Sequence, residues 1–372
     1  VDEAPAKPDE RIIVVENALK SLQQLAGYHR DRFNIPFIAI TGSNGKTTTK
    51  ELVHAVLASH YITYTTHGNL NNHIGVPLTL LGIKNDAQIA VIEMGANHQK
   101  EIEGYCAYTK PTCGIITNCG KAHLEGFGGI EGVRKGKGEL YDYIRTHGGN
   151  VIAFDDYGYL HEMSKGIENI YWYGSAKGEV TGHVQPGRAF ADIAITKGTF
   201  FNEIKTQMAG VYNLPNILCA VAAGKYYGVP DEKIKEAIES YVPSNSRSQL
   251  IHKGTNTIIL DAYNANPTSM KAAIENFAAI DANDKVLVLG GMMELGDESI
   301  GEHEQIVKLI ESYTWKKVAL TGGDFNKFNH PYLYFNDATE TAAWLADQHL
   351  QHTHLLIKGS RSMQMEKTLT AL

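Results

Sequence analysis

At 372 residues the chain is longer than one ordinary domain core, and its length predicts two or three domains. Hydrophobic residues make up 43% and charged residues 20%, which is typical of a globular protein and excludes a disordered one. Lysine and arginine number 34 against 41 aspartates and glutamates, and the formal charge of -7 argues against nucleic acid as a partner.

The cysteines and the apolar runs indicate the compartment in which the chain works. Four cysteines without CxxC spacing, in a chain far larger than a disulfide-stapled scaffold, favour reduced, buried thiols. No apolar run approaches the roughly 20 residues that a membrane-spanning helix needs, and the start VDEAPAKPDE lacks the apolar region of a signal peptide. We therefore expect a cytoplasmic monomer with no membrane span and no nucleic-acid partner.

A short leading segment precedes the first regular pattern. Residues 1–10 are charged and contain two prolines, which is typical of a linker. An apolar run at 12–15 follows, and then a helical pattern with Leu19, Leu22 and Leu25 on one face. This piece is too small to fold alone.

From Pro36 the pattern changes to apolar strands that alternate with amphipathic helices, which predicts a parallel sheet with crossover helices. Residues 178–210 favour β structure through their alternating apolar positions. The expected strands are PFIAIT at 36–41, IAVIEM at 89–94, GIITN at 114–118 and VIAFD at 151–155, and the expected helices are at 46–59 and 213–228. These elements predict a central domain at about 35–242.

The Pro-, Ser- and Asn-rich segment VPSNSRSQ at 242–249 predicts a hinge. Beyond it strands and helices alternate again, which predicts a second, smaller Rossmann-like α/β domain at about 243–372. Its expected elements are the strands NTIILDAY, KVLVLGG, KKVALTGG and HLLIKG, helices near 268–280, 302–313 and 338–349, and a last helix at the end.

The sequence TGSNGKTTT at 41–49 lies between a predicted buried strand and a predicted helix, which is the context of a phosphate-binding loop. Gly42 and Gly45 let backbone N–H groups approach phosphate oxygens, and the helix start adds its positive dipole end. Lys46 is placed to reach the β and γ phosphates, and Thr47 to ligate Mg²⁺. The first glycine of the common GxxxxGK[ST] pattern is replaced, and the competing interpretation is a glycine-rich turn with a solvated lysine. The order strand, loop, GKT and helix favours an ATP site.

Three more polar residues are candidate site residues at the carboxyl edge of the same predicted sheet. Glu93 ends a predicted strand, where its carboxylate suits Mg²⁺ or an oriented water, the alternative being a solvated strand end. His123 precedes the glycine-rich turn EGFGGIEG, and a lone histidine is more often a structural hydrogen-bonding group than a ligand. Lys137 lies in a predicted helix, where a solvated face is the default.

Two further loops carry clustered amide side chains. GNLNNHIGVPLT at 68–79 includes Asn71 and Asn72, which suit phosphate or metal-bound water, with turn formation as the alternative. DAYNANPTS at 261–269 follows a predicted strand, and its Asp261 is placed either to accept a hydrogen bond from a ribose hydroxyl or to cap a helix.

In combination these motifs resemble those of the Mur ligases, the ATP-dependent amide-forming enzymes of bacterial cell-wall synthesis. The resemblance rests on seven ordered blocks: TGSNGKTTTKE, GNLNNHIGVPLTLL, AVIEMGANHQKEI, AHLEGFGGIEGVRKGKGE, DAYNANPTSMKAA, VLVLGGMMELGDES and KGSRSMQMEK. It implies an enzyme that joins D-alanyl-D-alanine to a UDP-muramoyl tripeptide through an acyl phosphate, with ATP and Mg²⁺, and releases ADP and phosphate.

The resemblance also assigns roles to individual residues. It implies catalytic roles for Lys46, His123 and Lys137, and Lys137 would be the lysine that members of this family carbamylate. An ammonium beside Mg²⁺ is repulsive, whereas a carbamate offers an anionic oxygen ligand. The implied metal ligands are Thr47, Glu93, His123 and Lys137. The implied nucleotide contacts are Gly42, Ser43, Asn44, Gly45, Lys46, Thr47, Thr48, Asn213, Asn216, Arg247 and Asp261. The implied substrate contacts are Asn71, Asn72, Asn264, Asn266, Lys358, Ser360 and Arg361.

The chain departs from the family pattern in two places. Tyr212 stands where the family often has histidine, next to the expected adenine contacts. Of the family's N-terminal domain, only the last segment, RIIVVENALKSLQQLAGYHR, is present. Residues 1–34 are therefore expected to be a linker and a remnant of that domain. Because that domain holds the uridine end of the substrate, we expect the UDP substrate to bind poorly and ATP to bind normally.

Two rival functions remain open at this point. Another ligase of the superfamily, such as a folylpolyglutamate synthetase, would accept a different acid and amine, and DAYNANPTSM and GGMMELGDES argue against it. A non-catalytic switch would bind ATP without any dependence on an amine.

Overall fold

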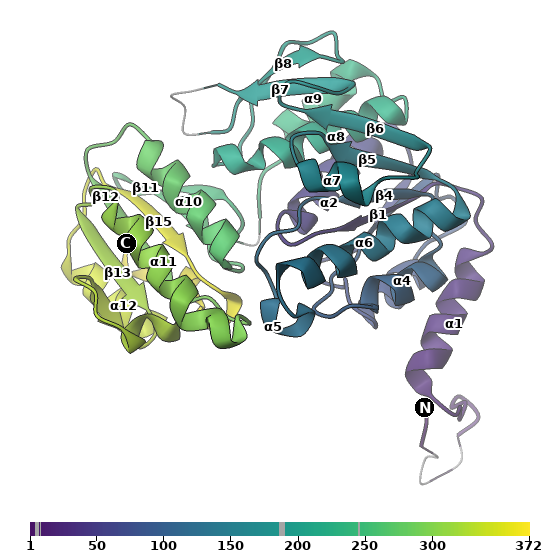
Figure 1. The fold of residues 1–372 in the computed structure, drawn as a ribbon, viewed down its shortest axis with the longest axis horizontal. Coiled ribbons are helices and arrows are strands. Elements are labelled where there is room, and N and C mark those ends of the chain that lie inside the picture. Colours follow the sequence, from purple (N-terminus) through teal and green to yellow (C-terminus); the bar gives the residue numbers. More distant parts are fainter. Residues whose placement is uncertain (4–6, 8, 186–189, 245) are drawn as a thin grey trace.

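The computed structural model describes residues 1–3, 7, 9–185, 190–244 and 246–372. Parts of three predicted segments lie outside the described residues. These are residues 4–6 and 8 of the linker, 186–189 of the β-rich segment and 245 of the hinge. The described residues form two sheets with helices on both faces, and the two parts of the molecule lie side by side (Figure 1). The predicted α/β class is confirmed.

In the part of the chain that the structure describes, the first sheet has nine strands. They lie in the order β2 (Thr63–Thr65), β3 (Ile89–Glu93), β1 (Phe37–Thr41), β4 (Cys113–Ile116), β5 (Asn150–Phe154), β6 (Asn169–Gly174), β7 (Val180–Val184), β8 (Ile193–Lys197) and β9 (Glu203–Ile204). Neighbours from β2 to β7 are parallel, and β8 and β9 pair antiparallel. Strands β1 and β3 are buried along their whole length, which is why they are apolar at consecutive positions.

Helices cover both faces of this sheet. They are α1 (Ala18–Arg30), α2 (Lys46–Ala58), α3 (Gly75–Leu81), α4 (Glu101–Thr109), α5 (Leu124–Phe127), α6 (Ile130–His147), α7 (Gly158–Met163), the 3-10 turn η1 (Val211–Asn213), α8 (Leu214–Tyr226) and α9 (Asp231–Glu239). Helices α2, α8 and α9 pack together on one face, and α4 and α6 pack on the other with α1 beside α4. No helix among the described residues combines the length and apolar character needed to cross a bilayer.

The second sheet follows in the chain after residue 248. Its strands lie in the order β10 (Gln249–Lys253), β11 (Asn256–Asp261), β15 (His354–Lys358), β12 (Lys285–Gly290), β13 (Lys317–Thr321) and β14 (Leu333–Phe335). Its helices and 3-10 turns are α10 (Pro267–Ala279), η2 (Gly296–Glu298), α11 (Ser299–Glu311), η3 (Gly323–Lys327), α12 (Ala338–Asp347), η4 (Arg361–Met363) and η5 (Met365–Ala371). β10 is antiparallel to β11, and the other pairs are parallel.

Alternate side chains of the second sheet enter different apolar clusters. Ile258 and Leu260 of β11 belong to the cluster that includes Leu345 of α12, whereas Ile259, between them, joins the cluster that includes Phe277 of α10. Successive side chains of a strand point to opposite faces, so both faces of β11 are covered by helices.

The four cysteines all lie in the first part of the chain and are buried, which agrees with the expectation of reduced thiols. Burial raises the pKa of the Cys113, Cys119 and Cys219 thiols to about 12.

The two ends of the chain differ from the sequence prediction. The predicted last helix is present as 3-10 helix, in the segments η4 and η5. Helix α1 forms where a helix was predicted, but Leu19 and Leu25 on its leucine face are 37% and 55% exposed. Its packed side contains Arg30, whose guanidinium donates to the carbonyl oxygens of Thr109 at 2.8 Å and Lys110 at 3.0 Å.

Candidate active site

The glycines of the predicted phosphate-binding loop are required by the backbone. Gly42 and Gly45 have φ values of 144° and 78°, a region that favours glycine. A Cβ on Gly42 would lie 2.0 Å from Thr117 Oγ1, and a Cβ on Gly45 would lie 2.5 Å from Asn216 Oδ1. Helix α2 begins directly after the loop, and no side chain caps its N-terminus. Its first N–H groups are therefore available to an anion.

A cleft of about 940 Å³ opens at the carboxyl ends of β1, β3 and β4 and is lined by residues of both parts of the molecule. Of the predicted site residues it is lined by Ser43, Asn44, Gly45, Lys46, Thr47, Thr48, Asn71, Asn72, Glu93, His123, Asn213, Asn216, Arg247, Asp261, Asn264 and Lys358. Gly42, Lys137, Asn266, Ser360 and Arg361 do not line it. The parallel strands thus bring together residues from most of the chain, as an α/β sheet does at its carboxyl edge.

Glu93 is the buried acid of this cleft. Its Oε1 accepts hydrogen bonds from Thr47 Oγ1 at 3.1 Å and Asn71 Nδ2 at 2.7 Å, and the residue is fully buried. Its Oε2 has no hydrogen-bond partner among the described residues. A buried carboxylate oxygen without a donor is costly, and a cation bound beside it would remove that cost.

Lys46 lies beside the loop and close to two other charges. Its ammonium donates to the carbonyl oxygens of Gly42 at 2.7 Å and Ser43 at 3.2 Å. Burial lowers the pKa of Lys46, the Glu93 carboxylate raises it, and the Arg247 guanidinium lowers it further. An anionic phosphate beside Lys46 would favour its charged form.

Lys137 lies behind the cleft wall and not on a solvated helix face, so the default interpretation from sequence was wrong. It is 1% exposed, and its Nζ donates to the carbonyl oxygen of Ala96, a cleft residue, at 2.9 Å. The same nitrogen lies 4.8 Å from the centroid of the Phe127 ring. Burial lowers the pKa of Lys137 well below its usual value, and the positive charge of Lys46 lowers it further. No carboxylate oxygen of the described residues lies within 4 Å of this nitrogen.

His123 contacts the second part of the molecule. Its Nδ1 lies 2.6 Å from Oε2 of Glu294, and this contact lowers the pKa of Glu294. Both residues have positive φ, 53° and 63°, so both loops are held in a conformation that non-glycine residues seldom adopt. Glu294 was missed from sequence as a site residue, although it lies in the block GGMMELGDES. The sequence carried no signal that this acid would meet His123 across the cleft.

Known proteins resemble this chain in sequence along almost its whole length. Family models described as "Mur ligase middle domain" and "Mur ligase, glutamate ligase domain" match residues 40–224 and 246–361. The chain is 31% identical to the UDP-N-acetylmuramoyl-tripeptide--D-alanyl-D-alanine ligase of Bacillus subtilis (strain 168), over 99% of this chain and 82% of that protein. The chain belongs to the Mur ligase family.

Other members of the family agree with this assignment. The enzyme of the same name from Escherichia coli (strain K12) is 32% identical over 97% of this Mur ligase and 82% of its own length. A crystal structure of MurF from Acinetobacter baumannii is similar with a TM-score of 0.88 and 32% identity, covering 98% of this chain and 83% of that chain.

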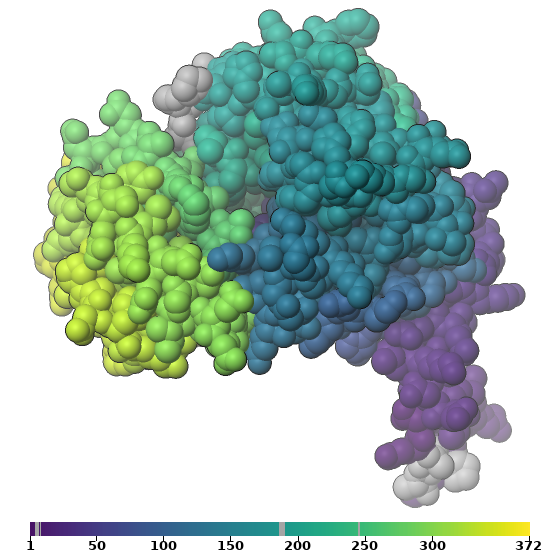
Figure 2. Space-filling model, in the orientation of Figure 1, coloured from purple at the N-terminus to yellow at the C-terminus, as the bar shows by residue number. Residues whose placement is uncertain are grey.

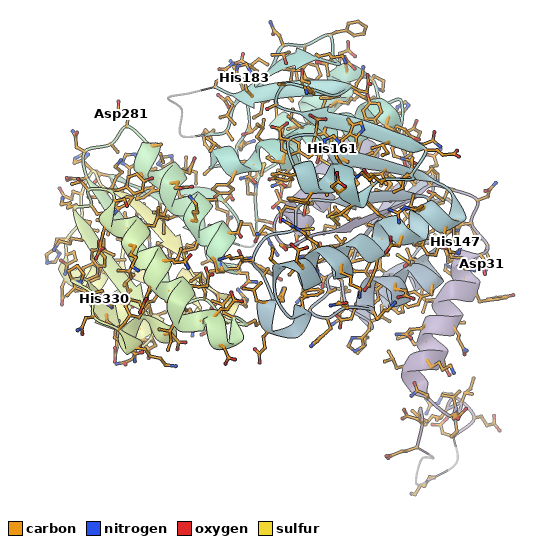
Figure 3. All side chains as sticks on the ribbon, viewed as in Figure 1. Asp31, His147, His161, His183, Asp281 and His330 are labelled. Atoms are coloured by element: carbon orange, nitrogen blue, oxygen red, sulfur yellow. The ribbon has the colours of Figure 1, made fainter. Side chains whose placement is uncertain are left out.

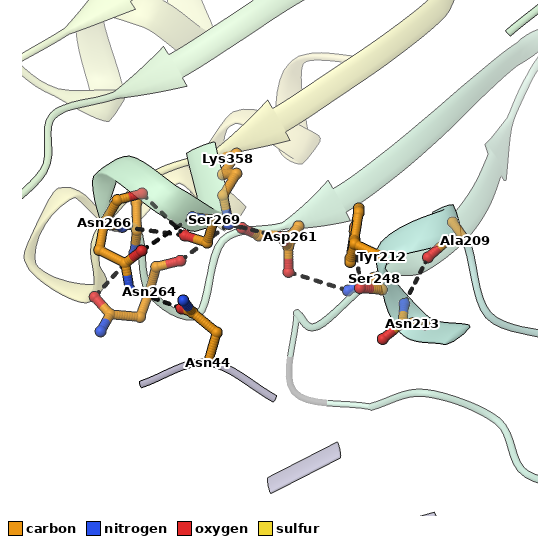
Figure 4. Close-up of polar contacts among 11 residues, drawn as sticks. Asn44, Ala209, Tyr212, Asn213, Ser248, Asp261, Asn264, Asn266, Ser269 and Lys358 are labelled. Carbon is orange, nitrogen blue, oxygen red and sulfur yellow. Dashed lines mark hydrogen bonds and ion pairs between the residues drawn. The ribbon is translucent and has the colours of Figure 1, made fainter. Parts of the chain in front are cut away.

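In this Mur ligase, four of the predicted residues of the second part, Asp261, Asn264, Asn266 and Lys358, make hydrogen bonds beside the cleft (Figure 4). Lys358 Nζ lies 2.6 Å from Asp261 Oδ2 and donates to the carbonyl oxygen of Asn264 at 3.2 Å. Asp261 Oδ1 accepts from the backbone N–H of Ser248 at 3.2 Å. Asn266 Nδ2 donates to Oδ1 of Asn44 in the phosphate-binding loop at 2.7 Å. The acid predicted for a ribose hydroxyl is thus already paired with the predicted substrate lysine.

Arg247 stacks on an aromatic ring that lines the cleft. Its guanidinium carbon lies 3.5 Å from the centroid of Tyr263, and its Nε has no hydrogen-bond partner among the described residues. Arg361 lies 5.7 Å from the same ring and pairs with Glu366. A guanidinium with a free N–H, held flat on a ring, is placed to bind an anionic group in the cleft.

The two asparagines expected to contact adenine use their amides within the protein. Asn213 Nδ2 donates to the carbonyl oxygen of Ala209 at 2.8 Å (Figure 4), and Asn216 Nδ2 donates to Asn213 Oδ1 at 2.9 Å. Asn216 Oδ1 accepts from Thr49 Oγ1 at 3.0 Å, which fixes α8 against α2. Their contact with a base stays a prediction, as do the substrate roles of Ser360 and Arg361.

Several histidines do not line the cleft. They include His147, His161, His183 and His330, which Figure 3 labels. No group of three or more His, Cys, Asp or Glu side chains in the described part of the chain is arranged to hold a metal ion by itself. A metal in the cleft would therefore need further ligands, such as phosphate oxygens.

Proposed function

We propose that this chain uses ATP to join D-alanyl-D-alanine to a UDP-N-acetylmuramoyl tripeptide, a step of peptidoglycan precursor synthesis. One observation carries the proposal: Lys46 and Glu93 line the cleft at the loop between β1 and α2, and Lys137 is bonded to the cleft residue Ala96, in a chain that aligns over 97–99% of its length with ligases of this name. The γ-phosphoryl group passes to the peptide carboxylate and ADP leaves. The amine then attacks the carbonyl carbon, and the C–O bond to phosphate breaks.

The residues around Glu93 fit a magnesium ion. Thr47 supplies a hydroxyl and Glu93 a buried carboxylate oxygen without a donor, while the other ligands would come from phosphates and water. When bound, the metal would offset the negative charge of the phosphates. His123 is a further candidate ligand, and in this arrangement its Nδ1 faces Glu294.

The surroundings of Lys137 support a carbamate on this residue. Burial lowers the pKa of Lys137 well below its usual value, which favours the uncharged amine, and that amine would attack the carbon of CO₂ and then lose a proton. The carbamate is an anion, and the positive charge of Lys46, which disfavours an ammonium on Lys137, would favour it.

We also propose a division of roles between the two parts of the chain. Residues of about 35–242 bind ATP, and residues of about 243–372 close over it and contribute Arg247, Asp261 and Lys358. The family models, which match residues 40–224 and 246–361, support this division.

The function is tested by measuring ADP release with ATP, the UDP-tripeptide and D-alanyl-D-alanine, and again with each omitted. We expect release only when all three are present. Release that needs a folate and glutamate instead would support the folylpolyglutamate synthetase alternative. ATP binding without release under any combination would support a non-catalytic switch.

The magnesium proposal predicts the effect of Glu93→Gln, which keeps the shape of the side chain and removes its charge. The Mg²⁺ concentration for half-maximal ADP release should rise about tenfold or more, because the carboxylate is the anionic protein ligand. Glu103→Gln, at an acid that pairs with Lys100 on the surface of α4, is the matched control. An unchanged magnesium titration in Glu93→Gln would contradict the proposed site.

A further inference from the structure

The loop between β4 and α5, residues 117–123, is bonded to the phosphate-binding loop. The Ser43 N–H donates to the carbonyl oxygen of Asn118 at 2.9 Å, and the Asn44 N–H donates to Asn118 Oδ1 at 2.9 Å. The Gly120 N–H donates to Ser43 Oγ at 3.0 Å. Any shift of this loop would therefore move Ser43 and Asn44.

The same loop also contacts the second part of the molecule, through Lys121. Its backbone N–H donates to Thr268 Oγ1 in the first turn of α10 at 3.0 Å. Its Nζ lies 2.5 Å from Oε1 of Glu302 on α11. The contact is close, since a Cβ on Gly120 would lie 2.9 Å from Thr268 Oγ1. Figure 2 shows the two parts touching along this boundary.

Glu302 is the buried partner in this contact. The residue is 4% exposed and lies in the first turn of α11. Lys121, whose side chain is 42% exposed, is the cation beside it among the described ion pairs. If the two parts moved apart, the Glu302 carboxylate would lose this cation and regain water, so the pair forms only when the parts are together.

We infer that Lys121 is a positioning residue that holds the second part closed over the phosphate-binding loop through Glu302. It lines the cleft, but its ammonium is engaged by Glu302, so it acts on the reaction through the loop of residues 117–123 and not by binding phosphate. The effect on turnover rests on the proposed function, whereas the effect on closure does not.

Other ion pairs provide the contrast. Lys316 and Asp284 also form a close pair, at 2.6 Å, but both belong to the second part and their side chains are 37% and 43% exposed. Such a pair cannot report on the distance between the parts. Lys316→Met is therefore the matched control for Lys121→Met.

The experiment compares Lys121→Met, Lys121→Arg, Glu302→Gln and the double variant Lys121→Met/Glu302→Gln with the parent. Small-angle X-ray scattering of each protein with ADP and Mg²⁺ gives the radius of gyration. Calorimetry gives the ADP dissociation constant, and the ADP-release assay gives kcat.

We expect Lys121→Met to increase the radius of gyration and to lower kcat about tenfold, the size of a typical coupling between two sites. ADP affinity should fall by no more than about tenfold, because only the contacts that depend on closure are lost and Lys121 itself does not bind phosphate. Lys121→Arg should restore most of the rate, and the double variant should be no worse than Lys121→Met, because both changes break one contact.

Three results would overturn the inference. These are an unchanged radius of gyration in Lys121→Met, strictly multiplicative losses in the double variant, and a large loss of ADP affinity, which would make Lys121 a phosphate ligand. If the parent itself shows no turnover, the proposed function fails, and the scattering data still decide whether the contact closes the molecule.

Discussion

Lys137→Ala is expected to lose ligase activity by about 10²-fold or more, the range found when one preorganised electrostatic group is removed from an active site. The side chain is almost completely buried behind the cleft wall, and its carbamate would place an anion near Lys46 and the metal. The ADP-release assay measures the loss. A small carboxylate such as acetate should enter the space left by the side chain and restore part of the rate in a saturable way.

Two variants make this prediction specific. Lys137→Arg should be inactive and should not respond to acetate, because the guanidinium fills the space and keeps the positive charge. Lys135→Ala, at an exposed lysine of the same helix, should behave like the parent. Bicarbonate labelled with ¹³C should give a carbamate signal by NMR in the parent and none in Lys137→Ala. Near-normal activity of Lys137→Ala would refute the carbamate.

Lys46→Ala is expected to abolish measurable turnover. Its ammonium is the positive charge at the start of α2, and charge-assisted hydrogen bonds to phosphate are stronger than those it makes to Gly42 and Ser43. The loss should reach about 10²-fold or more, since the same charge acts on ATP and on the transferring group. Thermal unfolding with and without ADP should show that the variant folds but gains less stability from the nucleotide.

Lys84→Ala, at an exposed lysine of the first part of the chain, is the control for loss of one positive charge. Turnover of Lys46→Ala within a few-fold of the parent would mean that this loop does not bind the phosphates of ATP.

The features that were predicted correctly depend on local pattern. The loop between β1 and α2 follows from glycine spacing, and strand β1 from consecutive apolar residues. Glu93 was placed at the sheet edge because it ends a strand, and parallel strands end together. Each of these statements needs only neighbouring residues and the rule that parallel strands alternate with helices.

The features that were missed depend on contacts between distant segments. The contact of His123 with Glu294 joins residues 171 positions apart (294 − 123), and both lie in loops of positive φ. The burial of Lys137 follows from packing of α6 against Phe127 and Ala96, which the pattern of α6 alone does not reveal. The strand β10 pairs antiparallel with β11, although its sequence was assigned to the hinge and the residues after it.

The four thiols make the two parts of the molecule differ in their reaction with a thiol reagent. All of them belong to the first part, each is buried, and a thiol with a pKa near 12 is almost wholly protonated and unreactive at neutral pH. Cys106, Cys113 and Cys219 do not line the cleft, so a thiol reagent can modify them only when the first part opens, and it does not report on the second part. The rate of modification therefore measures the opening of the first part alone, and a bound nucleotide would slow it.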